Sequence, residues 1–291
     1  MKFPELTYAT PSDPAWKRLT IQTMERWAGR DYFVPHYETW RRDIVGQKPH
    51  IMRPALDLLK VDLQLASGQW PPKLDQDAPL VVVSNHPFGI LDGFAALALA
   101  EELGRPFKVL IHKDLIRVPE IRPYSLPIDF AETREAQAAN IETRRTALRL
   151  LAEGTTIVVF PAGGVATSPT VFGRAVDLPW KTFTARMIQA SKAQVLPLYI
   201  EGQCSPLFHL VSKYSLTLRL SIIIREFRRK VGEPLRVHIG EVIPFEAIEA
   251  RTDRKAVMRM LYDRVHAMSG MDPMDVRQRM SQLPSYLRGG G

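Results

Sequence analysis

Val81-Val-Val-Ser-Asn-His-Pro-Phe-Gly-Ile-Leu-Asp-Gly93 is the stretch that says most about the fold of this chain. It continues a short apolar run at 80–83, which is typical of a buried strand, and Asn85 and His86 follow that strand directly. Pro87 and Gly89 predict a loop, and Asp92 lies where a helix over about 92–103 would begin. Ligand and catalytic groups in open α/β sheets collect just beyond the carboxyl ends of strands. The stretch therefore predicts an α/β fold with a functional site at this turn.

His86 and Asp92 are six residues apart, which on a continuous helix would place them about 120° from each other. A loop at Pro87 and Gly89 can instead fold His86 back over the helix N-terminus, within reach of Asp92. A histidine beside a carboxylate is the usual general-base arrangement, because the carboxylate fixes the tautomer and stabilises the imidazolium. The alternative is that Asp92 is a plain helix N-cap and His86 an ordinary turn histidine. Spacing alone leaves both open.

Short apolar runs and helical stretches alternate along the rest of the chain. Strands are predicted at 80–83, 107–111, 156–160, 195–200 and 235–239, and helices at 92–103, 133–153 and 252–269. This alternation predicts a mixed, largely parallel sheet with helices on both faces.

The chain divides into three predicted regions. Residues 1–78 are expected to form a helical N-terminal region, because 14–28 and 51–66 both carry apolar residues at helical spacing. The break at Gly68-Gln-Trp-Pro-Pro72 then predicts a boundary, followed by an α/β domain at 79–270. Residues 271–291 form a C-terminal tail, of which 288–291 are expected to be disordered.

Composition narrows the class of protein. The 291 residues carry 39 Lys+Arg and 31 Asp+Glu, a net charge of +8, and 45% hydrophobic residues, which is normal for a globular protein. Cys204 is the single cysteine, so an intramolecular disulfide and a cysteine-rich zinc site are excluded and a reducing compartment is expected. The seven histidines are scattered and no metal site is predicted.

The sequence also bears on targeting signals, membrane spans and binding partners. The first residues contain no apolar signal region, and no run approaches the roughly 18–20 apolar residues of a membrane span. The positive charge suggests an anionic partner. Nucleic acid is disfavoured, because no helix-turn-helix, zinc-finger or RNP-type pattern is present. The apolar run 216–230 ends in Arg225, Arg228, Arg229 and Lys230, which predicts either a surface for anionic lipid or a buried element with a charged end.

The block Asn85–Gly93 resembles the active-site motif of the glycerophospholipid acyltransferase family, which includes lysophosphatidic acid acyltransferases. That family usually has four residues between its histidine and aspartate. The five found here resemble a bacterial branch with lyso-ornithine-lipid O-acyltransferases and haemolysin-like proteins. Phe160-Pro-Ala-Gly-Gly-Val165, called the second block below, and Val195-Leu-Pro-Leu-Tyr199 are similar to two further family motifs. The resemblance covers about residues 79–240.

The resemblance implies an O-acyltransferase of membrane lipid biosynthesis. It would take an acyl group from an acyl carrier protein or coenzyme A thioester to a lyso-lipid hydroxyl, with no bound cofactor. His86 would be the general base and Asp92 its orienting group, and turns at Gly89 and 162–165 would supply oxyanion donors. The other residues expected to contact substrate are Asn85, Lys113, Arg117, Pro161, Ala162, Gly163, Gly164 and Lys181. For the basic residues, including Arg122 as a substitute for Arg117, a solvated surface charge is the alternative.

One departure from the family bears on the substrate. Ala162, Gly163 and Gly164 stand where the family commonly has a glutamate. We therefore expect weak use of lysophosphatidic acid and a preference for another lyso-lipid, such as lyso-ornithine lipid. The enzyme is expected to work in the cytoplasm, at the inner face of the cell membrane. Two rival functions remain: a hydrolase that uses the same pair on water, and a non-catalytic lipid-binding protein of this fold.

Overall fold

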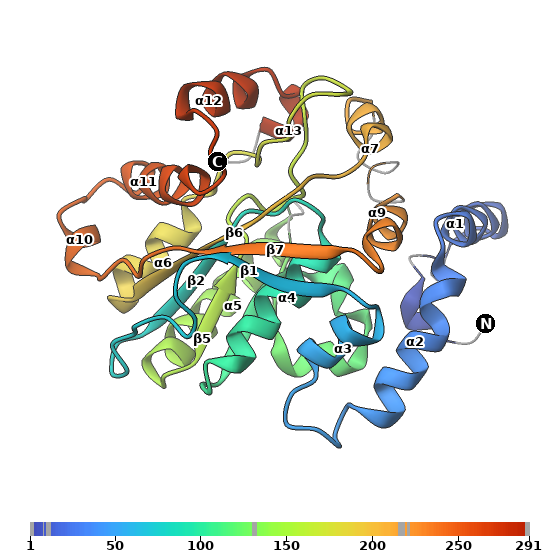
Figure 1. The fold of residues 1–291 in the computed structure, drawn as a ribbon, viewed down its shortest axis with the longest axis horizontal. Coiled ribbons are helices and arrows are strands. Elements are labelled where there is room, and N and C mark those ends of the chain that lie inside the picture. Colours follow the sequence, from blue (N-terminus) through green and yellow to red (C-terminus); the bar gives the residue numbers. More distant parts are fainter. Residues whose placement is uncertain are drawn as a thin grey trace.

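A mixed seven-stranded sheet with the strand order β1-β7-β6-β2-β5-β3-β4 is the centre of the molecule (Figure 1). The computed structural model describes residues 3–7, 9, 13–129, 133–214, 219 and 222–288. The strands are β1 (Asp62–Ser67), β2 (Leu80–Ser84), β3 (Phe107–His112), β4 (Ser125–Ile128), β5 (Thr156–Val159), β6 (Gln194–Ile200) and β7 (Pro234–Ile239). The pair β6–β7 is antiparallel and the other neighbours are parallel, so the predicted largely parallel sheet is confirmed.

The central strand β2 shows that both faces of the sheet are covered. Leu80 and Val82 belong to one buried cluster, which they share with α3 (Met52–Leu58), α4 (Ile90–Glu102) and α9 (Ile223–Lys230). Val81 and Val83 point the other way, into a cluster with α5 (Arg134–Ala152), α6 (Phe183–Ser191) and α11 (Arg254–Ala267). Side chains alternate across a strand, so a continuous apolar run such as 80–83 fits only a strand buried on both faces.

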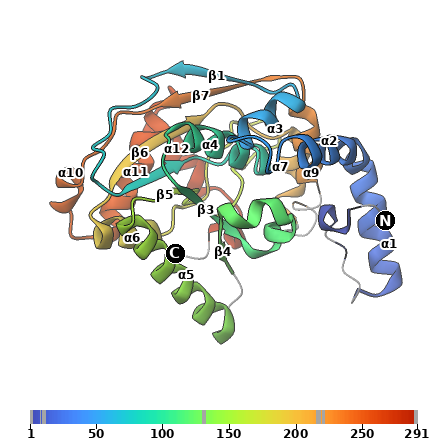
Figure 2. The same ribbon diagram turned by 90° about the horizontal axis from the view of Figure 1, so that it is seen from below.

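The remaining helices lie around this core. They are α1 (Ala15–Trp27), α2 (Arg30–Asp43), α7 (Pro206–Val211), α10 (Glu246–Glu249), α12 (Pro273–Ser281) and α13 (Ser285–Arg288), with 3₁₀ turns η1 (Pro4–Leu6), η2 (Lys113–Arg117) and η3 (Pro119–Tyr124). Both views place α9 beside α1 and α2 (Figures 1 and 2), where Phe33 stacks on Phe227 with ring centroids 4.7 Å apart.

The predicted helix over 51–66 is wrong in its second half. The helix ends at Leu58, Lys60 adopts a left-handed φ of 54°, and residues 62–67 form β1 at the edge of the sheet, parallel to β7. Backbone pairing with β7 overrides the local helical spacing. Gly68 completes this edge, since a Cβ there would lie 2.0 Å from the carbonyl oxygen of Ile239. The sheet thus includes a strand N-terminal to the predicted boundary at residue 79.

Two further segments differ from the sequence expectation. The short strand β4 was not predicted, because Pro127 interrupts its sequence; a proline is tolerated there because β4 is the other edge of the sheet. The C-terminal segment is helical, and Val276, Leu283 and Leu287 are buried in the cluster around α11. Arg288 ends α13, while 289–291, expected to be disordered, lie outside the described residues.

Candidate functional site

His86 and Asp92 meet at the carboxyl end of β2, as the loop between them predicts. Nδ1 of His86 lies 3.0 Å from Oδ2 of Asp92. The distance suits a hydrogen bond, but the ring is turned outside the usual angular range for one. The imidazole is partly exposed and the carboxylate fully buried, so the histidine is the member of the pair that a substrate can reach.

The Asp92 carboxylate also holds the loop that carries the histidine. Its Oδ2 accepts hydrogen bonds from the backbone N–H groups of Phe88 (2.7 Å) and Gly89 (2.8 Å). Gly89 has φ 87°, a left-handed conformation that glycine adopts at little cost. Burial raises the pKa of Asp92, while His86 and the two N–H groups oppose that rise. The carboxylate therefore caps the N-terminus of α4 from position N3 and also lies beside His86, while the role of His86 as a base stays a prediction.

The backbone and ring of His86 are fixed by residues after β5. Its N–H donates to Oδ1 of Asp177 (3.0 Å), and its carbonyl accepts from the N–H of Ala166 (2.7 Å). Its ring stacks on Phe160 with centroids 4.4 Å apart. Sequence reasoning missed Asp177; the signal was a lone carboxylate in the otherwise apolar segment 176–180.

The side chain of Asn85 is hydrogen-bonded to the protein backbone. Its side-chain amide exchanges two hydrogen bonds with the backbone of Ile200, at 2.9 Å and 2.7 Å. These bonds tie the end of β2 to the end of β6. Asn85 thus supports the loop, and its amide oxygen and nitrogen are already engaged by backbone.

The second block lies beside the loop at residues 86–89, which is called the His86 loop below. The backbone N–H groups of the second block are not equivalent. Gly163 donates its N–H to the carbonyl of Phe160 (3.0 Å), and Ala166 is bonded to His86. Among the described atoms, the N–H groups of Gly164 and Val165 have no acceptor. The Val165 side chain lies against Gly89, 3.1 Å from where a Cβ there would be. Because Gly89 gives its own N–H to Asp92, the pair Gly164–Val165 is the better oxyanion candidate.

The predicted basic residues are distributed unequally around this site. The backbone N–H of Lys181 donates to the carbonyl of Pro161, which places Lys181 beside the second block, and burial lowers its pKa. Lys113 forms an ion pair with Asp129 (2.6 Å), and Arg117 donates to the carbonyl of Thr7 (2.8 Å). These last two contacts engage Lys113 and Arg117 with other parts of the chain, and their contact with substrate stays a prediction.

The four cations at the end of the segment 216–230 contact neighbouring groups of the protein. Arg225 lies over the ring of Trp27 (5.6 Å to the centroid) and Arg228 over Tyr32 (3.6 Å), so both join α9 to the N-terminal helices. Arg229 is 3.6 Å from Glu226. Residues 215–218, 220 and 221 of the segment lie outside the described residues.

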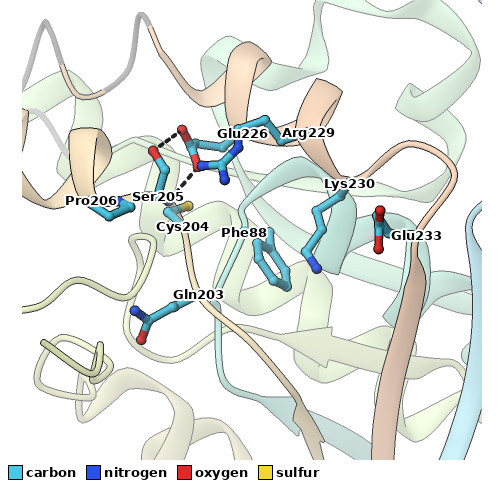
Figure 3. A pocket seen from close by; sticks show the side chains of 9 residues that line it. All are labelled: Phe88, Gln203, Cys204, Ser205, Pro206, Glu226, Arg229, Lys230 and Glu233. Carbon is cyan, nitrogen blue, oxygen red and sulfur yellow. Dashed lines mark hydrogen bonds and ion pairs between the residues drawn. The ribbon is translucent and has the colours of Figure 1, made fainter. Parts of the chain in front are cut away.

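A pocket of about 320 Å³ lies between α9 and the loop that follows β6 (Figure 3). Lys230 points toward the ring of Phe88, with Nζ 5.0 Å from its centroid, and Glu226 binds Ser205. The thiol of the buried Cys204 donates to the carbonyl of Pro87 (3.3 Å). The pocket is therefore built on the His86 loop, on its β6 side. Its lining residues are Phe88, Gln203, Cys204, Ser205, Pro206, Glu226, Arg229, Lys230 and Glu233.

Two features of the described residues bear on cofactors and membranes. No group of three or more His, Cys, Asp or Glu side chains in that part of the chain is arranged to hold a metal ion. Within it, no helix combines the length and the apolar character needed to cross a bilayer.

Comparisons with known proteins show which family and fold the chain is similar to. A family model described as "Acyltransferase" matches residues 66–269. The lyso-glycine lipid O-acyltransferase of Phocaeicola vulgatus is 25% identical over 187 residues, which are 60% of this chain and 63% of the relative. The crystal structure of the 1-acyl-sn-glycerophosphate acyltransferase PlsC from Thermotoga maritima matches with a TM-score of 0.50 at 17% identity, over 88% of this chain and 98% of that one. At this identity the last match shows the fold alone.

Proposed function

Because the chain belongs to the glycerophospholipid acyltransferase family and is an acyltransferase, we propose that it acylates the hydroxyl of a lyso-lipid in membrane lipid biosynthesis. The acyl donor would be a thioester of acyl carrier protein or coenzyme A. The observation that carries the proposal is the partly exposed His86 imidazole, 3.0 Å from a fully buried carboxylate at the end of a central strand. A lipid-binding protein without catalysis would have no use for such a pair.

His86 would act as the general base through Nε2, since Nδ1 faces Asp92. As Nε2 takes the hydroxyl proton, the acceptor oxygen forms a bond to the thioester carbonyl carbon. The tetrahedral oxyanion then collapses, the C–S bond breaks, and the thiolate takes the proton from the imidazolium. Asp92 stabilises the imidazolium while it exists. The N–H groups of Gly164 and Val165 would donate to the oxyanion, since those of Gly89 and Gly163 are engaged elsewhere.

The acceptor is proposed to be a lyso-aminolipid, with lyso-ornithine lipid as the preferred candidate. The second block contributes Ala162, Gly163 and Gly164 and no carboxylate, which disfavours the glycerol-phosphate acceptor of the wider family. The relative from Phocaeicola vulgatus, by its name, acylates lyso-glycine lipid, and it covers much of the same region. Both observations support a lyso-lipid other than lysophosphatidic acid.

The enzyme is proposed to act at the cytoplasmic face of the cell membrane, and α1 supports this. Trp16, Leu19 and Trp27 are 71%, 66% and 65% exposed. At 100° per residue these positions fall within about 80° of one another, so they form one apolar stripe. Large exposed apolar stripes are typical of membrane or protein contact. Arg225 contacts Trp27, so basic charge lies next to the stripe and would attract anionic lipid.

The catalytic proposal is tested with purified protein, acyl carrier protein and coenzyme A thioesters, and lyso-lipid acceptors. His86→Ala should lower the rate of acyl transfer by roughly 10² to 10⁴ with the fold intact. His50→Ala, which changes a half-exposed histidine beside Glu101, is the matched control and should keep activity. Near-normal transfer by His86→Ala would contradict the mechanism. Release of free fatty acid without transfer to any acceptor would favour the hydrolase.

Vesicle sedimentation tests the membrane proposal. The protein should bind vesicles with anionic lipid more than neutral ones, and less at high salt. Replacing Trp16 and Leu19 with Ser should reduce binding, whereas Met274→Ser, at another exposed apolar residue (70%) on α12, should not. Equal loss in both variants would contradict a specific role of α1.

A further inference from the structure

The backbone of the His86 loop is held by two buried carboxylates. Asp92 takes the N–H groups of Phe88 and Gly89, and Asp177 takes the N–H of His86 itself. Pro87 has no N–H to give. Every backbone donor from residue 86 to residue 89 therefore ends on one of these two side chains, and Asp177 is the one that fixes the residue carrying the imidazole.

Asp177 is itself fixed from behind. It is 1% exposed, and its second oxygen, Oδ2, accepts the indole N–H of Trp180 at 2.9 Å. The Trp180 ring packs edge-on against Tyr262 and His266 of α11, with centroids 5.3 Å and 6.1 Å away. Burying a carboxylate is costly unless hydrogen bonds compensate it. Both oxygens of Asp177 have a donor. The carboxylate therefore connects the His86 loop to Trp180, which packs against α11.

The position of His86 depends on these hydrogen bonds of Asp177. Its ring lies 3.0 Å from Asp92 but outside the angular range of a hydrogen bond, so the direction in which the backbone at residue 86 carries the side chain bears on whether that bond can form. The carbonyl of His86 is held by Ala166 and the ring rests on Phe160. With the N–H also held, both backbone polar groups of His86 and one face of its ring have a partner. Displacement of a catalytic group by about 1 Å can cost about 10²-fold in rate.

We propose that Asp177 is a positioning residue that sets the orientation of His86 toward Asp92, because its carboxylate bridges the His86 backbone N–H and the Trp180 indole N–H. The kinetic part of this inference rests on the proposed function, because it assumes that His86 is the base. The structural part does not, since the position of His86 can be measured in the folded protein whatever reaction it performs.

The test uses the variants Asp177→Asn and Trp180→Phe and the double variant. Asparagine has one acceptor oxygen and one N–H₂ group, so in Asp177→Asn an N–H₂ must face either the His86 N–H or the indole N–H. We expect kcat to fall about 10- to 100-fold while KM for the thioester stays within about twofold. In the double variant the indole N–H is gone, so the amide can turn its oxygen to His86. We expect kcat to return to within about threefold of the Trp180→Phe value.

Trp70→Phe is the matched control, because Trp70 also donates its indole N–H to a carboxylate, Glu102, at 2.9 Å, in a bond that does not involve the His86 loop. It should leave kcat unchanged. A direct readout is the amide proton resonance of His86 in NMR spectra, which should move in Asp177→Asn, return in the double variant and stay in Trp70→Phe. Thermal melting confirms that each variant is folded.

The outcomes separate the two claims. If wild type performs no acyl transfer, the proposed function fails, and the His86 resonance still tests the positioning role. If wild type is active and His86→Ala is not, then wild-type kcat in Asp177→Asn overturns the inference. A double variant as slow as Asp177→Asn also overturns it, because the defect would then not depend on competition with the indole.

Discussion

Replacing Asp92 with Asn should remove most of the acyltransferase activity and leave the fold standing. All three contacts of the carboxylate are made by Oδ2, while Oδ1 has no partner among the described residues. An asparagine can therefore place its oxygen where Oδ2 lies and keep the bonds from Phe88 and Gly89. Its N–H₂ takes the position of Oδ1. What is lost is the negative charge beside His86.

The size of the loss follows from that charge. With Nδ1 and Oδ2 at 3.0 Å, the centres of the two charged groups lie roughly 4 Å apart, and at an effective dielectric constant of about 20 their attraction is about 4 kcal/mol. This energy is gained only when the imidazolium forms, that is, in the transition state. We therefore expect kcat to fall about a thousandfold. The buried N–H₂ loses hydrogen bonds, but a buried charge is also removed, so the free energy of unfolding should change by about 1 kcal/mol or less.

Steady-state acyl transfer and thermal melting measure the two effects. Glu101→Gln is the matched control: Glu101 is a buried carboxylate on the same helix that accepts the N–H groups of Ile51 (2.8 Å) and Met52 (3.1 Å). It should lower the free energy of unfolding more than Asp92→Asn does, because both of its oxygens accept an N–H, and it should leave kcat unchanged. If Asp92→Asn kept more than about a tenth of the wild-type kcat, the electrostatic role of Asp92 would be refuted.

Three further predictions test the site and its surroundings. In competition within one assay, lyso-ornithine lipid should be acylated faster than lysophosphatidic acid, and the reverse preference would contradict the reasoning from the second block. Gly202→Ala should lower the free energy of unfolding by about 1–3 kcal/mol and reduce kcat, because a Cβ there would lie 2.5 Å from the buried Phe88 ring; Gly46→Ala, at another positive φ but in open space, should keep kcat. Burial lowers the pKa of His209 from 6.5 to about 4, so between those values the unfolded chain binds a proton that the native state does not. The free energy of unfolding measured in denaturant should therefore decrease from pH 6.5 to 4, by about 3 kcal/mol at most from this group, and His209→Asn should flatten that decrease.

The local pattern of the sequence was sufficient for the centre of the fold. A strand buried on both faces leaves a continuous apolar run, and residues 80–83 and 195–200 show it directly. The meeting of His86 and Asp92 was also predictable, because a proline and a glycine within six residues force a loop too short to carry the two side chains far apart.

The edges of the sheet were not predictable in the same way. The residues of β1 have one buried side chain, Leu63, and its spacing continues the helix before it, so no local signal separates strand from helix. Residues 62–67 form a strand because their backbone pairs with β7. The strand β4 is short, carries Pro127 and is equally dependent on its neighbour.

For the site, too, local sequence and tertiary structure decide different properties. The sequence determined which residues could act as base, orienting acid and glycine-rich turn, because these types and spacings are local. Only the tertiary structure decided which of them are free to act. It engaged Lys113 and Arg117 with the protein's own chain and gave the N–H of Gly89 to Asp92, while the N–H groups of Gly164 and Val165 have no acceptor in the part of the chain that the structure describes. It also brought Asp177 to the backbone of His86 across 91 residues of chain, since β5 is the neighbour of β2 in the sheet and the segment after β5 must therefore pack against the His86 loop.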